Sequence, residues 1–198
     1  MKKILATLFM AVFSFMNSQT NSGTLYFKDG TSKKGLISSP NEIAKGKITF
    51  KDENNNVKEI EVSEIEKLDY GFFPFYPIQN NKYYLLTKKI IDDPKVKLYV
   101  YQSVDRTDYM GLYNTRNTIV ADTYVYFIEM DGKKPEVISS WYDKGITVFV
   151  KKANIKYILK YFKDKCPKMA DAYKNDEIKF KDNPTPFIEY YINNCSKN

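Results

Sequence analysis

The stretch TYVYFIEM, residues 123–130, carries apolar or aromatic side chains at odd and even positions alike. Successive side chains of a β-strand point to opposite faces of its sheet, so a strand exposed on one face alternates between apolar and polar residues. Because this alternation is missing here, the sequence predicts a central strand that is covered on both faces.

Further strand-like segments surround this one between Lys82 and the start of the helical segments near residue 152. They read KYYLLTKKI (82–90), VKLYVYQS (96–103), KPEVISS (134–140) and ITVFVKK (146–152). Asp131-Gly132, directly after the central strand, is typical of a two-residue hairpin turn. The long polar segment at residues 103–118 predicts an exposed loop. Together these segments predict a central antiparallel sheet.

Three apolar patterns with helical spacing follow in residues 152–198, which predicts three helices packed on one face of the sheet. Pro167 and Pro186 suit the first turns of the second and third helices. The patterns consist of Ile155, Ile158, Leu159 and Phe162, then Cys166, Met169, Ala170 and Tyr173, and finally Ile188, Tyr191, Ile192 and Cys195.

Residues 20–78 predict a small β module of short strands and tight turns. Asp29-Gly30 and the loop at residues 53–56 each separate two strand-like runs, which is the pattern of a β-hairpin. Four or five short strands would form a small curled sheet or an SH3-like or Sm-like barrel. The predicted fold class is therefore α+β: this module, the central antiparallel sheet, and C-terminal helices packed on it.

The first residues have the layout of a secretory signal peptide. Lys2 and Lys3 precede an apolar run at residues 4–16, and polar residues follow that run. A bilayer core needs about 20 apolar residues, so this run is too short for a permanent anchor. We expect residues 1–19 to be removed, leaving a periplasmic, outer-membrane-associated or secreted protein without a membrane span.

The chain contains two cysteines, Cys166 and Cys195. The helical patterns place each on the apolar face of its own helix, and an even number of cysteines in an exported protein is typical of a disulfide. The alternative is a reactive thiol. The chain has no histidine to activate one, and an apolar environment raises the pKa of a thiol. We expect Cys166 and Cys195 to be bridged.

The net charge and the distribution of basic residues indicate which class of partner to expect. The net charge of +7 falls to +5 when Lys2 and Lys3 leave with the signal, since no acidic residue precedes Asp29. The lysines are scattered, and Arg106 and Arg116 are the only arginines, whereas nucleic-acid binders cluster basic residues on one face. The expected partner is an envelope protein or a glycan, and not nucleic acid; the oligomeric state is left open.

The missing histidine also restricts the chemistry. Histidine-based nucleophile activation and histidine-ligated zinc are excluded, and no glycine-rich phosphate-binding motif occurs. We therefore expect no catalytic residue, no metal and no cofactor. The alternative is a secreted hydrolase that uses paired carboxylates, because such pairs cleave glycosides without histidine. Its candidate pairs are Asp92 with Asp93, and Asp105 with Asp108.

The stretch GFFPFYPIQN, residues 71–80, is the expected boundary between the β module and the rest of the chain, because Pro74 and Pro77 interrupt strand ladders. Its aromatic residues have two interpretations. They pack between the two halves of the protein, or they form an exposed platform for sugars or peptides. The candidate ligand surface consists of Phe72, Phe73, Phe75 and Tyr76.

Two parts of the chain resemble small, uncharacterised exported proteins of flavobacterial-type bacteria. The N-terminal part, LYFKDGTSKKGLI followed by KITFKDENNNVKEIEVSEIEKLDY, is similar to their strand, Asp-Gly, strand module. The C-terminal part, YILKYFKDKCPKMADAY followed by FIEYYINNC, is similar to their Cys-Pro helix start and Tyr-x-Asn-x-Cys ending, with Lys165 as an extra residue before Cys166. The resemblance implies export and a disulfide and no particular activity. We expect a non-catalytic binding or scaffolding protein in the periplasm or at the cell surface.

The signal peptide leads to the first testable prediction. The mature N-terminus is expected between Met16 and Asn21, with the protein outside the cytoplasm, because the apolar run ends at Met16. Cell fractionation followed by N-terminal sequencing checks both points. Full-length chain retained in the inner membrane would contradict the prediction.

Overall fold

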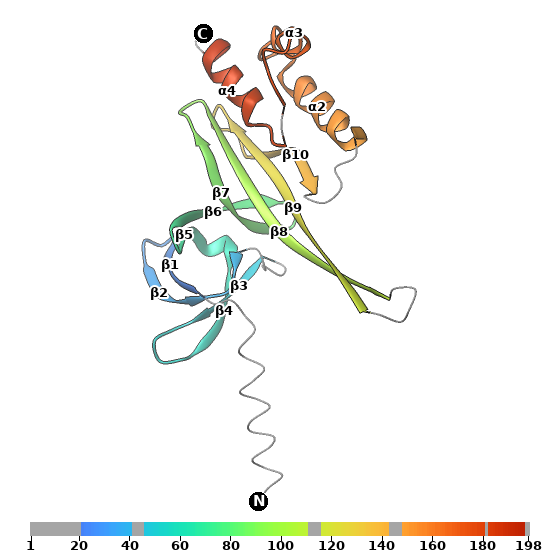
Figure 1. The fold of residues 1–198 in the computed structure, drawn as a ribbon. Helices are drawn as coiled ribbons and strands as arrows, with labels where there is room; N and C mark the ends of the chain where they lie inside the picture. The colour runs from blue at the N-terminus through green and yellow to red at the C-terminus, as the bar shows by residue number, and fades with distance from the viewer. Residues whose placement is uncertain (1–20, 41–45, 111–115, 143–147, 181, 197–198) are drawn as a thin grey trace, which may run out of the picture.

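The computed structural model describes residues 21–40, 46–110, 116–142, 148–180 and 182–196 (Figure 1). The predicted signal peptide lies outside these residues. The strands are β1 (Asn21–Phe27), β2 (Ser32–Ile37), β3 (Lys47–Lys51), β4 (Val57–Glu61), β5 (Ile65–Tyr70), β6 (Phe73–Asn80), β7 (Tyr83–Asp92), β8 (Val96–Met110), β9 (Arg116–Met130) and β10 (Glu136–Tyr142). The helices are the 3-10 turn η2 (Val62–Glu64), α2 (Val148–Phe162), α3 (Met169–Lys174) and α4 (Thr185–Asn194).

The described strands form one ten-stranded antiparallel sheet in the order β10-β9-β8-β7-β6-β5-β1-β2-β3-β4. Strands that follow one another in the chain are neighbours, except β4 and β5: β4 is an edge strand, and β5 pairs with β1 instead. The predicted β-rich α+β class is confirmed. The SH3-like or Sm-like barrel is wrong, because β4 and β10 remain as two edges and the N-terminal strands curl without closing.

Strand β6 joins the two halves of this sheet. It pairs with β5 through Phe73–Phe75 and with β7 through Phe75–Asn80, so Phe75 is the residue of β6 that has partners on both sides. The stretch expected as a boundary that interrupts the ladder is therefore a continuous strand. Pro74 is its second residue, and Pro77 lies where β6 pairs with β7 alone, positions at which a missing N–H is tolerated.

Two apolar cores lie at the two ends of the sheet. The N-terminal core gathers the inward side chains of the curled strands: Leu25, Ile37, Ile48, Phe50, Ile60, Val62, Ile65, Leu68, Phe75 and Leu86. The C-terminal core lies between β8–β10 and the helices, and its largest side chains are Trp141, Phe162 and Phe187. Figure 1 shows the helices on one face of that end of the sheet.

The two-sided burial expected for residues 123–130 is confirmed. Tyr126 and Ile128 belong to the C-terminal core beneath the helices, whereas Phe127 lies on the opposite face with Ile78 and Tyr99. Strand β9 pairs with β8 on one side and with β10 on the other. It is an interior strand, second from the sheet edge.

Two expected segments differ in the structure. The polar segment expected as a loop instead extends β8 and β9, whose register continues from Val96↔Met130 to Met110↔Arg116. Its polar composition does not prevent this, because the ladder bonds come from backbone groups. The segment expected as the strand ITVFVKK contributes to α2, which begins at Val148. Packing of this helix on the sheet overrides the local β-propensity of valine and phenylalanine.

Helix α2 also covers the outer edge of β10. The Asn154 side chain accepts a hydrogen bond at Oδ1 from the Ser140 N–H (3.3 Å) and donates from Nδ2 to the Ser140 carbonyl (2.9 Å). These bonds occupy backbone groups that an added strand would otherwise use.

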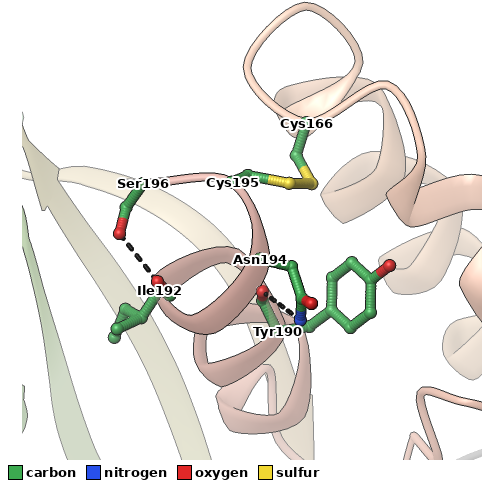
Figure 2. Close-up of a disulfide and its surroundings, with 6 residues drawn as sticks. All are labelled: Cys166, Tyr190, Ile192, Asn194, Cys195 and Ser196. Carbon is green, nitrogen blue, oxygen red and sulfur yellow. Dashed lines mark hydrogen bonds between the residues drawn. A yellow bond between two sulfur atoms is a disulfide. The ribbon is translucent and has the colours of Figure 1, made fainter. Parts of the chain in front are cut away.

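The expected bridge between Cys166 and Cys195 is present, with a Cα–Cα separation of 5.5 Å (Figure 2). The periodicity predicted that each cysteine lies within a helix. In the structure both cysteines lie just outside the ends of helices. Cys166 precedes α3, and Cys195 follows α4, where its N–H donates to the Tyr191 carbonyl (2.8 Å). Pro186 lies in the first turn of α4, as predicted. No helix among the described residues is long and apolar enough to cross a membrane.

Removing the bridge should lower stability without altering the sheet. The cysteines are 29 positions apart, and opening a loop of that size is expected to cost about 3–4 kcal/mol in the chain-entropy model. Urea unfolding of the Cys166→Ala/Cys195→Ala variant measures the loss. The matched control is wild type with reducing agent, which should show the same loss. Ready labelling of both cysteines by a thiol reagent in the folded, unreduced protein would contradict the bridge.

Candidate functional site

The turn between β5 and β6 exposes two phenylalanines. Gly71 has φ = +61°, a left-handed conformation that glycine adopts without strain, and it leads directly into Phe72. The Phe72 side chain is 98% exposed, and Phe73, the first residue of β6, is 57% exposed. These two residues therefore contribute little to the core.

The other two aromatic residues of the predicted surface lie differently. Phe75 is 5% exposed, belongs to the N-terminal core, and packs edge-on against Tyr70 with ring centroids 6.2 Å apart. Tyr76 is half-buried against Tyr99, with the cluster that also contains Ile78. Phe72, Phe73 and Phe75 thus line one hollow, whereas Tyr76 is not part of it.

This hollow, the aromatic groove, has a volume of about 540 Å³. Its apolar wall consists of Pro40, Tyr70, Gly71, Phe72, Phe73 and Phe75, and its polar wall of Asn21, Ser22, Ser39 and Lys88. The groove brings together the start of β1, the β5–β6 turn and the middle of β7. No acidic side chain is among these lining residues.

Lys88 is the charged residue of the aromatic groove. It lies opposite Phe75 in the β6–β7 register, which brings its ammonium to 4.6 Å from the Phe73 ring centroid and 5.4 Å from that of Phe75. A cation at such distances from aromatic faces is attracted by their π electrons. Its neighbour Lys89 instead lies over the Tyr76 ring (4.7 Å) and pairs with Asp92 (2.9 Å).

A second polar cluster lies beside Tyr76. Glu129 accepts a hydrogen bond from the Tyr99 hydroxyl (2.9 Å) and pairs with Lys97 (2.7 Å). Burial, followed by the bond to Glu129, raises the pKa of Tyr99 well above its usual range. The hydrogen bond from Lys97 to Glu129 raises the pKa of Lys97. Tyr99, Lys97 and Glu129 are thus hydrogen-bonded or ion-paired with one another, which is typical of a structural role.

The structure gives Asp92 and Asp93 no shared site. Asp92 pairs with Lys89, and Asp93 accepts the Lys95 backbone N–H (2.9 Å) within its own turn. The side chains of Asp105 and Asp108 lie outside the described residues. No group of three or more potential metal ligands occurs in the part of the chain that the structure describes.

A second hollow of about 510 Å³ lies in the N-terminal half. Its lining carries both charge signs, with Lys33, Lys34 and Lys58 as the basic residues and Asp52, Glu53, Glu59 and Glu64 as the acidic ones. Asp52 is already engaged in its turn, where hydrogen bonds from Asn56 hold its pKa below the usual range. This hollow lacks the concentrated aromatic surface of the aromatic groove.

Comparisons with protein-family models, with curated proteins and with solved structures found no match. The functional argument therefore rests on the geometry of the aromatic groove.

Sequence reasoning found the aromatic residues but missed two of their neighbours. Lys88 is one of many scattered lysines, and Tyr70 carries no signal of its own in the sequence. Only the pairing of Phe75 with both Leu68 and Lys88 brings these elements together. No local signal in the sequence specifies that register.

Alanine substitutions should separate the buried ring from the exposed one. Phe75→Ala is expected to lower the free energy of unfolding by about 3–5 kcal/mol, the usual range for deleting a buried phenylalanine. Phe72→Ala should change it by no more than about 0.5 kcal/mol, because an exposed side chain loses little packing. Urea unfolding of both variants gives the comparison. Equal losses would show that the two rings are equally buried.

Proposed function

We propose that the protein is an exported, non-catalytic binding protein of the periplasm or cell surface, and that the aromatic groove is its binding surface. The observation that carries the proposal is the exposure of Phe72, 98%, beside the 57% exposure of Phe73.

Nothing in the local fold requires phenylalanine at these positions. The turn depends on Gly71, and a polar residue at position 72 would serve the solvent-exposed turn equally well. Adjacent exposed aromatic rings that border a hollow are typical of surfaces that bind another molecule. The expected partner is an envelope protein or a glycan.

The disulfide is compatible with export. Bridges persist in oxidising compartments such as the periplasm and the extracellular space, and they are rare in the cytosol. The bridge between Cys166 and Cys195 therefore supports the export proposal that the N-terminal sequence suggests. The resemblance to exported flavobacterial-type proteins points the same way.

A secreted hydrolase with paired carboxylates remains the alternative class of function. Hydrolysis of a glycoside needs two carboxyl groups that flank one bond. Asp92 and Asp93 are each engaged locally, so they do not support such a pair. No observation on the described residues favours this alternative over binding.

The proposal is tested by capture from an envelope extract with the immobilised mature protein. We expect one or a few retained components, identified by mass spectrometry, and at least about a fivefold loss with Phe72→Ala/Phe73→Ala, because truncating an interface hot spot costs more than about 1 kcal/mol. The matched control is Tyr157→Ala, which removes a half-exposed ring of α2 outside the aromatic groove. Equal retention by all three proteins would exclude the aromatic groove as the binding surface.

A further inference from the structure

We infer that the aromatic groove binds a small amphipathic carboxylate, with the apolar body of the ligand on Phe72 and Phe73 and its carboxylate on Lys88. The inference rests on the proposed function, in which the aromatic groove is the binding surface, and commits to a ligand class other than the envelope protein or glycan expected there. Under this inference, a neutral sugar is not the ligand that fits the groove best.

The apolar part of the argument comes from size and lining. A volume of about 540 Å³ lies within the range of small-molecule sites. Phe72 and Phe73 offer ring faces that are open to solvent, so covering them removes apolar surface from water. An alkyl or aryl group meets this requirement directly.

The charge of the ligand follows from Lys88. Its ammonium lies over the rings of Phe73 and Phe75, and no carboxylate of the described residues lies within ion-pair distance of it. Lys67 and Lys89 also lie over rings, but each is paired with an aspartate: Lys67 with Asp69 (3.1 Å) and Lys89 with Asp92 (2.9 Å). Lys28, Lys33 and Lys151 also lie over rings without an ion pair to a described residue, but they do not line the aromatic groove. Lys88 is thus the lysine that brings an unpaired ammonium to the described lining of the groove.

The remaining walls favour an anion over a cation. Among the described residues, the lining contains one ammonium and no acidic side chain, in contrast to the mixed charges of the second hollow. Asn21 and Ser22 add an amide and a hydroxyl on the polar wall, and the Asn21 amide donates to the Tyr70 hydroxyl (3.1 Å). The positive charge therefore meets no competing acid from the part of the groove that the structure describes.

Lys88 is also held in place before a ligand arrives. It is half-buried on β7, and two rings contact its ammonium. Hydrogen bonds between charged groups are stronger where neighbouring groups exclude water, and a positioned donor loses less conformational freedom on binding. A carboxylate that also covers Phe72 would satisfy both requirements in one ligand.

Calorimetric titration of the mature protein at low salt, with sodium decanoate below its micelle concentration, tests the inference. 1-Decanol is the uncharged probe of equal chain length. We expect decanoate to bind about tenfold more tightly than decanol, because a charged hydrogen bond contributes beyond the shared apolar contact. The preference should shrink as salt is added.

Two lysine variants provide a matched pair. Lys88→Gln should abolish the preference for decanoate over decanol, because it removes the charge while keeping most of the side-chain volume. Lys89→Gln changes the neighbouring lysine, which also lies over a ring but outside the groove, and should leave the preference intact. Phe72→Ala should weaken both probes. Circular dichroism verifies that each variant is folded.

The outcomes separate this inference from the proposed function. Equal affinity for decanol and decanoate, or an unchanged preference in Lys88→Gln, would overturn the carboxylate ligand while leaving the aromatic groove as a binding surface. Failure of both probes to bind, with capture still lost in Phe72→Ala/Phe73→Ala, would also overturn the inference alone. Failure of both probes together with unchanged capture would overturn both.

Discussion

The structure depends on the double pairing of β6. This strand pairs with β5 at Phe73–Phe75 and with β7 at Phe75–Asn80, so the two ladders overlap at a single residue. The Phe75 backbone links the two halves of the sheet, and its ring fills the N-terminal core. Without this overlap the curled strands and the helix-covered strands would be separate sheets, each with an additional open edge.

The same junction creates the aromatic groove. The β5–β6 turn projects Phe72 and Phe73 at the place where the two ladders meet, and the β6–β7 register brings the Lys88 ammonium over the Phe73 ring. Next along β7, Lys89 lies over Tyr76 outside the groove and is paired with Asp92. Adjacent residues on one strand therefore have different roles, one at the surface proposed for ligands and one in a structural ion pair.

Burial on both faces stabilises the C-terminal end of the sheet. Helices cover one face, where Trp141 stacks with Phe180 at a centroid distance of 5.0 Å, and the disulfide joins the end of α4 to the segment before α3. On the other face Phe127 is buried beside Tyr99, whose hydroxyl bonds Glu129. The edge bonds between Asn154 and Ser140 complete this end by occupying the free backbone groups of β10.

The sequence by itself determined the features that depend on local periodicity and turn chemistry. The missing alternation at residues 123–130 predicted two-sided burial, Asp131 and Gly132 form the expected turn with positive φ, and the helical spacing predicted C-terminal helices joined by Cys166 and Cys195. Tertiary structure alone decided the open sheet, the start of α2, and the position of the Lys88 ammonium over the Phe73 ring. These depend on strand register and on packing between segments far apart in the chain, where many arrangements satisfy the same local pattern and only the summed burial and backbone pairing select one.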